Sequence, residues 1–225
     1  LLMFFNLNHI FAQNIEDKSG ITILKPERLR AGDKVALVAP ASFISEKSLL
    51  TSIEKVKKLG LEPVYSEKIF GKYGYFSATD KERADDFNNM IINPEIKGVI
   101  LAAGGYGCTR ILELIDYEMI KKNPKVIIGF SDNTALVNTI HKKTGLVTFH
   151  GPIARTMHQG YNREHFESIV INPIDKYLIE STDDDIQKSN EDKVYERYTI
   201  TSGKLQGELV GGNLTLICSL MGTPY

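Results

Sequence analysis

The fold of this chain is decided by residues 125–134, which read Lys125-Val126-Ile127-Ile128-Gly129-Phe130-Ser131-Asp132-Asn133-Thr134. The apolar, β-branched run over 125–130 predicts a buried strand. The residues that follow, 132–143, predict a helix that begins almost at once. A strand that passes into a helix through so short a turn is typical of an α/β fold, and it places Ser131 at the start of the helix.

Strands and helices alternate on both sides of this junction. Short β-branched runs predict further strands at 34–40, 61–65, 99–103 and 147–149. Helical spacing predicts helices over 45–59, from Thr79 to Pro94 and after the glycines at 104–107. Thr79 and Glu82 have the capping-box spacing of a helix start. The predicted fold class is therefore α/β, with a doubly wound, mostly parallel sheet flanked by helices.

Composition divides the chain into parts. Residues 1–20 form a leader, 21–160 an α/β domain that carries Ser131, 161–204 a linker or excursion, and 205–225 the start of a second, C-terminal domain. The break near 160 marks the point where the regular alternation of strands and helices stops.

The C-terminal parts carry weaker signals. Residues 181–197 are polar and rich in acids without an apolar period, which predicts a solvated surface segment. Residues 198–201 and 203–210 look like strands that open the second domain. The apolar run at 216–221 has little sequence after it to cover it, which indicates a fragment.

The overall composition excludes several classes of protein. The chain has 225 residues, is 42% hydrophobic and 24% charged, and carries a formal net charge of -1. A balanced, ordinarily apolar chain is neither intrinsically disordered nor a nucleic-acid binder. Cys108 and Cys218 are too few for a disulfide scaffold or a cysteine-only zinc site, and their apolar neighbours predict buried free thiols. No histidine spacing indicates a metal site.

The apolar run at residues 1–12 is too short to span a bilayer as a helix. It is followed by polar residues, as the core of a secretory signal would be, although the chain begins with Leu and no cation precedes the run. We expect a partial signal and export to the periplasm or cell envelope. A strand or helix packed on the body is the alternative, and a cytoplasmic protein is then not excluded.

Two loops should meet at the carboxyl edge of the sheet, where ligands bind in open α/β folds. The first is Gly104-Gly105-Tyr106-Gly107, whose exposed amides can bind a phosphate or an oxyanion. As a dinucleotide fingerprint it is poor, because Arg110 occupies the place of the third glycine. A plain tight turn is the other interpretation.

The second loop carries Ser131. A serine delivered by a strand onto a helix start has the arrangement of a nucleophile elbow, although Asn133 occupies the place of the usual closing glycine. Capping of the helix by Ser131 or Asp132 is the simpler alternative. His150, at the end of the fifth strand, lies at the same edge, where it can be a functional or merely a structural residue.

Taken in order, six motifs resemble those of the LD-carboxypeptidases of serine peptidase family S66, which include the microcin C immunity peptidases. They cover about residues 25–225 and comprise Pro26-Glu27-Arg28-Leu29 with Gly32-Asp33 and Val38-Ala39-Pro40; Phe76-Ser77-Ala78-Thr79-Asp80-Lys81-Glu82-Arg83 with Asp86; Gly104-Gly105-Tyr106-Gly107 with Leu112; Gly129-Phe130-Ser131-Asp132-Asn133-Thr134-Ala135-Leu136; His150-Gly151-Pro152; and Gly211-Gly212-Asn213-Leu214 with Gly222-Thr223-Pro224. Ala103 and Cys108 depart from the family's usual arginine and small residue.

The resemblance implies a set of site residues. Ser131 is the implied nucleophile, and the backbone amides of Gly105 and Asp132 are the implied oxyanion hole. Candidates for contacts to the substrate are Gly104, Tyr106, His150 and Asn213. The Glu and His that complete the family's triad lie beyond the Gly-Thr-Pro turn, outside these residues, so the 225-residue chain alone is expected to be inactive or nearly so. No cofactor and no metal are implied.

The function that the resemblance implies is removal of terminal D-alanine from peptidoglycan tetrapeptides by a serine-type LD-carboxypeptidase. The expected partner is a peptidoglycan-derived peptide, with no nucleic acid, no stable membrane span and a possible homodimer. A microcin C-type immunity peptidase is the alternative within the family. A non-catalytic ligand-binding α/β module that uses the glycine loop is the alternative outside it.

Overall fold

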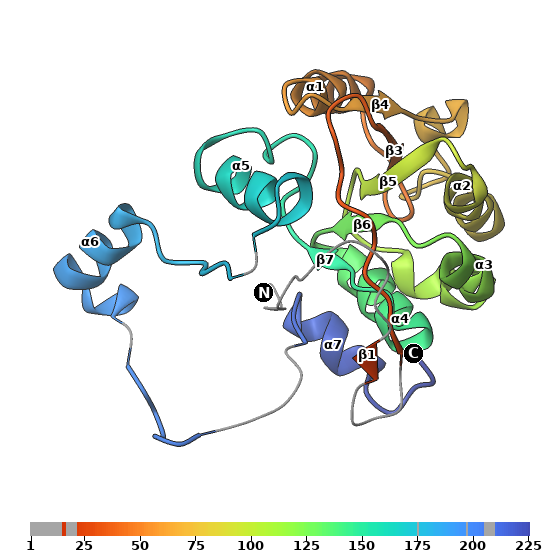
Figure 1. Cartoon of the computed structure of the whole chain (residues 1–225). Coiled ribbons are helices and arrows are strands. Elements are labelled where there is room, and N and C mark those ends of the chain that lie inside the picture. Colours follow the sequence, from red (N-terminus) through yellow and green to blue (C-terminus); the bar gives the residue numbers. More distant parts are fainter. Residues whose placement is uncertain (1–14, 17–21, 175, 197, 205–209) are drawn as a thin grey trace.

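The structure is a computed structural model that describes residues 15–16, 22–174, 176–196, 198–204 and 210–225 (Figure 1). The apolar run interpreted above as a signal lies outside the described residues, as does most of the strand predicted at 203–210. Within the described part of the chain, no helix is long and apolar enough to cross a membrane.

The centre of the molecule is a five-stranded sheet with the strand order β4-β3-β5-β6-β7. Every neighbouring pair is parallel, which confirms the predicted α/β fold class. The strands are β3 (Lys34–Val38), β4 (Glu62–Val64), β5 (Ile96–Leu101), β6 (Val126–Gly129) and β7 (Phe149–His150).

The fifth strand begins later than predicted. Phe149 and His150 pair with Ile128 and Gly129 of β6. Val147, which the sequence places in this strand, instead donates its amide to the Leu24 carbonyl at 2.8 Å. Leu24 belongs to the lead-in segment before β3, so a contact distant in sequence takes the start of the predicted strand away from the sheet.

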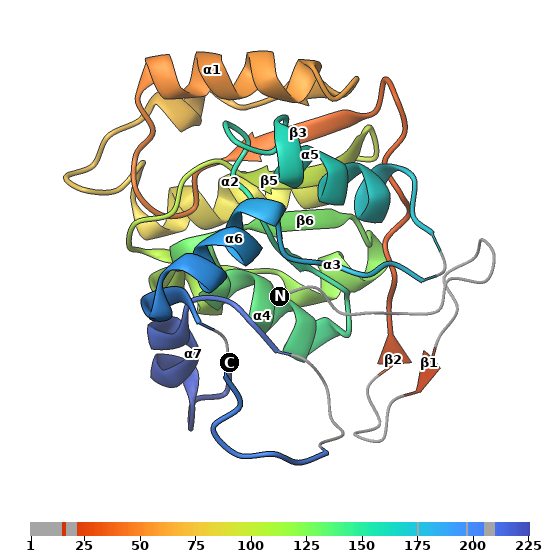
Figure 2. The same cartoon turned by 90° about the vertical axis from the view of Figure 1, so that its left-hand side faces the viewer.

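The sheet is covered on both faces, and successive side chains of a strand point to opposite faces. Helices α1 (Glu46–Lys57) and α5 (Gly160–Phe166) cover one face, together with the π-helical turn at Glu167–Ile171. Helices α2 (Asp80–Ile92), α3 (Tyr117–Lys122) and α4 (Thr134–Thr144) cover the other (Figures 1 and 2). In β3, for example, Val35 and Leu37 face the first layer while Ala36 and Val38 face the second.

Local signals fix the ends of the helices. The predicted capping box is confirmed, because the Thr79 side chain accepts from the Glu82 amide and the Glu82 carboxylate accepts from the Thr79 amide. Gly145 ends α4 with a φ of +73°. The helix predicted after the glycine loop is a 3-10 helix, Cys108–Leu114. Two other 3-10 helices of this part of the chain are Glu67–Phe70 and Ser131–Asn133.

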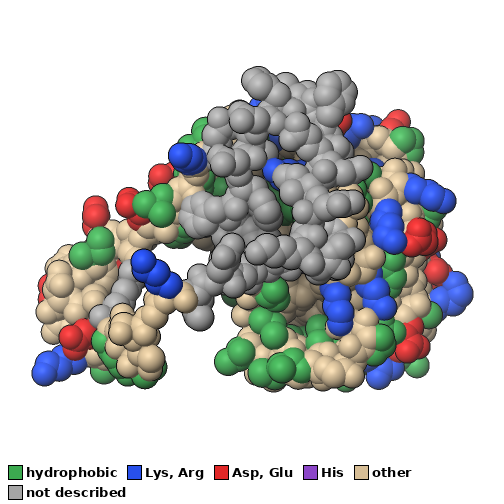
Figure 3. Space-filling view, turned by 60° about the horizontal axis from the view of Figure 1, so that its bottom comes forward, with side chains coloured by type: hydrophobic (Ala, Val, Ile, Leu, Met, Phe, Trp, Pro, Cys, Tyr) green, Lys and Arg blue, Asp and Glu red, His purple; other side chains and the backbone are tan. Residues whose placement is uncertain are grey.

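Residues 176–196 and 198–204 form an arm that extends from the body (Figure 1). Its exposure agrees with the prediction, but the helix α6 (Asp183–Glu191) was not foreseen. Thr182 caps α6, and three aspartates follow in its first turn, where negative charge stabilises a helix. Hydrophobic side chains of the arm are exposed (Figure 3), namely Leu178, Ile186, Val194, Tyr195, Tyr198 and Ile200.

Two further predictions at this end of the chain were wrong. Residues 198–201 form no strand, although their composition favours one, because no strand of the described part of the chain pairs with them. Cys218 is exposed rather than buried. It lies on α7 (Leu214–Leu220), where Leu216 and Leu220 pack on the core and Cys218, between them in sequence, points to a different side of the helix.

The remaining elements are small. Strands β1 (Ile15–Glu16) and β2 (Thr22–Ile23) form an antiparallel pair, and Lys193–Tyr195 is a 3-10 turn of the arm. Residues 160–171 pack on the same core as α1. The division of the chain at 160 and 204 stays a prediction.

Candidate active site

Ser131 occupies a strained backbone position. It follows β6 by two residues and has a φ of +60°, and it is the one non-glycine residue with a positive φ in the described part of the chain. Such a conformation costs about 1–2 kcal/mol for an L-residue other than glycine. Serine at a strained turn between a strand and a helix is the geometry of a nucleophile elbow.

Close packing forces this geometry. A Cβ at Gly129 would lie 2.6 Å from the Asn133 Cβ, so the strand and the helix start approach more closely than a side chain permits. A Cβ at Gly104 would lie 3.1 Å from the Ser131 Cβ and 3.5 Å from the Asp132 amide nitrogen. The glycine loop after β5 therefore lies directly against the elbow, as the parallel sheet predicts.

Hydrogen bonds join the two loops. The Asp132 carboxylate accepts from the Cys108 amide at 2.8 Å, and the Asn133 side-chain amide donates to the Ala103 carbonyl at 3.2 Å. The Cys108 thiol donates to the Asn133 Oδ1 at 3.3 Å. Burial and the nearby Asp132 raise the pKa of this thiol well above its ordinary value, so Cys108 stays protonated and packs as part of the core.

Neither Ser131 nor Asp132 caps the helix. No side chain makes a capping bond at the start of Ser131–Asn133 or of α4, and the Asp132 carboxylate binds across to Cys108 instead. Among the described residues, the Ser131 hydroxyl has no hydrogen-bond partner. The amides of Gly105 and Asp132 likewise donate no hydrogen bond within the described part of the chain. A hydroxyl and two free donors thus lie at one edge of the sheet.

His150 and Tyr106 adjoin the two loops, since His150 pairs with Gly129 in the sheet and Tyr106 follows Gly105 in the chain. The His150 ring lies 5.2 Å from the Phe130 ring, and its Nε2 is buried without a partner among the described residues. Burial lowers the pKa of His150, so its ring is neutral at pH 7. Tyr106 is 52% exposed, and its ring lies 6.0 Å from that of Phe76.

Asn213 is tied to the first residue of α4, three positions after Ser131. Its amide donates to the Thr134 hydroxyl at 2.9 Å, and its side chain accepts from the Leu216 amide at the start of α7. A Cβ at Gly212 would lie 2.5 Å from the Thr134 Cγ2, so this loop packs tightly on the first turn of α4. The role of Asn213 in substrate contacts stays a prediction.

The sequence analysis gave no role to two residues of this region, Ser42 and Arg83, although Arg83 belongs to one of the quoted motifs. The Ser42 hydroxyl donates to the Gly104 carbonyl at 2.6 Å. Arg83 is 1% exposed and donates to the carbonyls of Pro40 and Gly107. The available signal was the position of Arg83 one turn before Phe87, on the buried face of α2.

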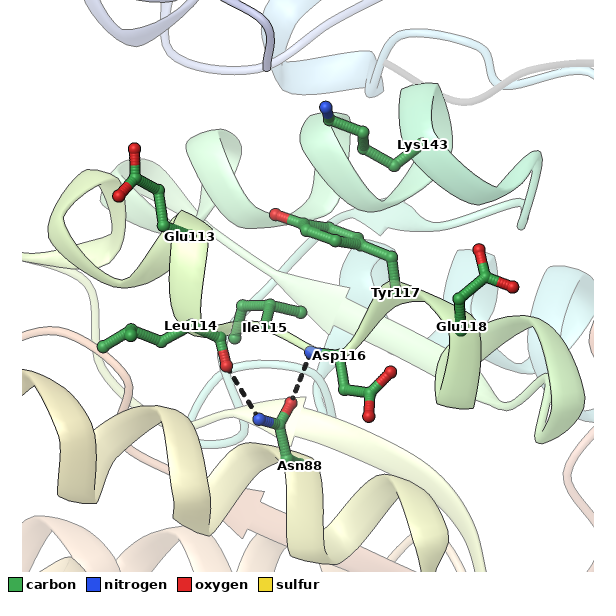
Figure 4. A pocket seen from close by; sticks show the side chains of 8 residues that line it. All are labelled: Asn88, Glu113, Leu114, Ile115, Asp116, Tyr117, Glu118 and Lys143. Atoms are coloured by element: carbon green, nitrogen blue, oxygen red, sulfur yellow. Dashed lines mark hydrogen bonds between the residues drawn. The ribbon is translucent and has the colours of Figure 1, made fainter.

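A separate hollow lies away from the elbow. It has a volume of about 590 Å³ and is lined by residues of α2, α3 and their connection, with Lys143 of α4 (Figure 4). Asn88 bridges Leu114 and Asp116 there. Lys143 lies in the last turn of α4, about 14 Å along the helix from Thr134, its first residue. Among the described residues, no group of three or more His, Cys, Asp or Glu could hold a metal ion.

The fold and the junction define an α/β protein with an elbow of the kind that carries a nucleophile. The chain belongs to the peptidase S66 family, because residues 35–151 match the family model of the LD-carboxypeptidase N-terminal domain. This range runs from β3 to the residue after β7 and includes both loops of the site.

Known relatives agree with this membership. The chain is 37% identical to a probable murein peptide carboxypeptidase of Bacillus subtilis over 89% of this chain and 60% of that protein. It is 32% identical to the microcin C7 self-immunity protein MccF of Escherichia coli, covering 88% of this chain and 63% of that protein. The solved structure of MccF in its wild-type apo state superposes with a TM-score of 0.68 at 26% identity, covering 88% of this chain and 65% of that one. The chain thus spans less than two thirds of these relatives.

Proposed function

We propose that this chain is the N-terminal part of a serine-type LD-carboxypeptidase that releases terminal D-alanine from peptidoglycan tetrapeptides. The observation that carries the proposal is the strained Ser131, with its unpartnered hydroxyl beside the free amides of Gly105 and Asp132. Strain of this kind persists only where the surrounding structure maintains it, and it is common at catalytic residues.

In the proposed reaction, the Ser131 hydroxyl oxygen attacks the carbonyl carbon of the scissile amide while its proton passes to a base. The Gly105 and Asp132 amides stabilise the oxyanion that forms. When the carbon–nitrogen bond breaks, the amine of D-alanine takes that proton and leaves an acyl-Ser131 ester. Water then attacks the ester, loses a proton to the base and releases the shortened peptide, and the proton returns to Ser131.

In this proposal, the general base that takes the Ser131 proton is not one of the 225 residues. His150 lies at the same sheet edge and is neutral, but it makes no hydrogen bond to Ser131, and its ring packs on Phe130. The family resemblance supports a Glu and a His in sequence that lies beyond Tyr225. The full-length protein is therefore the active form, and the 225-residue chain alone hydrolyses little or nothing.

The choice of substrate rests on the relatives. A murein peptide carboxypeptidase and a murein tetrapeptide carboxypeptidase, at 37% and 29% identity, support a cell-wall peptide. MccF supports the alternative, since its solved complexes include aspartyl sulfamoyl adenosine, an aminoacyl nucleotide analogue. Export and homodimer formation stay predictions.

The test is D-alanine release from a murein tetrapeptide by the full-length protein. Wild-type protein should release it, and Ser131→Ala should lower kcat by about 10⁴-fold or more. Ser52→Ala is the matched control, because it removes a serine hydroxyl from α1, where it donates to the Ser48 carbonyl. Cleavage of an aminoacyl sulfamoyl nucleoside but not of the tetrapeptide would favour the immunity-type activity. Cleavage of neither would contradict the proposal.

A further inference from the structure

The Gly105 amide lies in a peptide unit that needs an external anchor. It belongs to the Gly104–Gly105 peptide, and a peptide between two glycines can rotate as a unit because neither residue has a Cβ to restrict it. Gly105 has a φ of +103° and is exposed. Catalysis by an oxyanion hole requires donors that are already oriented when the charge develops.

Ser42 supplies such an anchor. Its hydroxyl donates to the Gly104 carbonyl at 2.6 Å, and its amide donates to the same oxygen at 3.3 Å. The peptide bond is planar and trans, so the Gly104 carbonyl and the Gly105 N–H point in opposite directions. When Ser42 holds the carbonyl, the N–H of Gly105 is directed away from Ser42 and cannot turn toward it.

The same peptide lies at the nucleophile. A Cβ at Gly104 would lie 3.1 Å from the Ser131 Cβ. A Cβ at Gly105 would lie 2.8 Å from the Ser42 Oγ and 2.7 Å from the Tyr75 hydroxyl. The Gly104–Gly105 peptide therefore lies between Ser42 on one side and the elbow at Ser131 on the other.

Arg83 holds the far end of the same loop. Its guanidinium donates to the Gly107 carbonyl at 3.1 Å and to the Pro40 carbonyl, and it pairs with Asp80. Pro40 and Ser42 belong to the segment that follows β3. The glycine loop is thus fixed at Gly104 and at Gly107 to one neighbouring segment, and Gly105 lies between the two anchors.

We infer that Ser42 is a positioning residue of this enzyme: its hydroxyl fixes the Gly104–Gly105 peptide so that the Gly105 amide faces the developing oxyanion. This inference rests on the proposed function. Ser42 contacts neither the nucleophile nor the substrate in this role, and it acts through the direction of one N–H.

The test uses the full-length enzyme with Ser42→Ala, Ser42→Thr and the control Ser52→Ala. Ser42→Ala keeps the hydrogen bond from the backbone amide of residue 42 to the Gly104 carbonyl but loses the shorter bond from the hydroxyl. We therefore expect kcat to fall by about 10- to 100-fold, which is less than the loss caused by removing a donor of the oxyanion hole. KM should stay unchanged, and the melting temperature should shift no more than in Ser52→Ala. Ser42→Thr keeps a hydroxyl and should recover most of kcat.

A fluorophosphonate gives an independent readout, because its phosphoryl oxygen occupies the oxyanion hole when Ser131 attacks. The rate constant of Ser131 labelling should fall in Ser42→Ala by about the same factor as kcat. An unchanged kcat, a loss confined to KM, or an equal loss in Ser42→Thr would overturn the inference while Ser131 labelling of the wild type persists. A wild-type protein that is not labelled at Ser131 would overturn the proposed function and this inference with it.

Discussion

The two loops at the carboxyl edge of the sheet hold similar backbone conformations with different residues. After β5, the left-handed positions are glycines, Gly105 at φ +103° and Gly107 at φ +137°. After β6, the left-handed position is Ser131 at φ +60°. Glycine adopts such a φ without strain, whereas serine does so at a cost of about 1–2 kcal/mol. At its left-handed positions the first loop offers only backbone, whereas the second keeps a side chain there at the expense of stability.

The two loops have different roles in the proposed reaction. In the proposed reaction the glycine loop supplies a directed amide, and a Cβ at Gly105 would clash with Ser42 and Tyr75. The elbow supplies the hydroxyl in that reaction, and the Ser131 Cβ lies 3.1 Å from the position that a Cβ at Gly104 would take. A substitution in the glycine loop should therefore affect the proposed reaction through the backbone amide. A substitution at Ser131 should affect it through the loss of the hydroxyl.

The first prediction, with the largest expected effect of the three, concerns Gly105 in the glycine loop. In Gly105→Ala, the new Cβ would meet the Tyr75 hydroxyl and the Ser42 Oγ below 3 Å, so the loop must move and the amide is misdirected. We expect kcat of the full-length enzyme to fall by about 10²- to 10³-fold. Gly32→Ala is the matched control, since Gly32 also has a positive φ, +86°, but open space around it. A Gly105→Ala enzyme as active as Gly32→Ala would contradict the comparison.

The second prediction concerns stability at the elbow. Ser131→Gly should be more stable than Ser131→Ala by about 1 kcal/mol, because glycine relieves the left-handed strain. At Ser52, within α1, the order should reverse, since glycine in a helix costs about 1 kcal/mol relative to alanine. Free energies of unfolding from chemical denaturation of the four variants measure both differences. A Ser131→Ala variant at least as stable as Ser131→Gly would mean that Ser131 is not strained.

The smallest expected effect is on the pH dependence of stability, which should differ between His150, next to the elbow, and Asp80, whose partner Arg83 holds the glycine loop. Burial lowers the pKa of His150 below 6.5, so between its folded and unfolded pKa the unfolded chain binds more protons. Stability should therefore fall as pH decreases from about 7 through the unfolded pKa of about 6.5. At the start of α2, hydrogen bonds from Arg110 and Arg83 outweigh desolvation and lower the pKa of Asp80 below 3.8. Its stabilising contribution is present above that value and is lost only as pH falls through the folded pKa.

Unfolding free energies at pH 7.5 and 5.5 test this difference. His150→Gln should reduce the loss of stability between the two pH values, and Asp80→Asn should leave it unchanged while it lowers stability at both. If Asp80→Asn alone altered the slope, the assignment of the two groups would be reversed.

Much of this edge could be predicted from the sequence, because its signals are local. β-Branched runs end at glycine or polar residues, so β5, β6 and the loops after them follow from patterns of a few residues. The α2 capping box is equally local. The position of Ser131 at a strand–helix junction needed no knowledge of the rest of the chain.

The contacts that fix the loops could not be predicted in this way. Ser42 and Gly104 are 62 positions apart, and only the parallel pairing of β3 with β5 brings the ends of these strands together. Helix α6 was missed for the opposite reason. It depends on the Thr182 cap and charges near its start rather than on an apolar face, so the pattern that identifies packed helices is absent.

The most direct test of the account is the site at which a fluorophosphonate reacts with the full-length protein. Tandem mass spectrometry of the digested adduct identifies the modified residue. The account predicts a single phosphonylated serine, Ser131, and no adduct in Ser131→Ala. An adduct on another residue, or an unmodified Ser131 in protein that releases D-alanine, would contradict it.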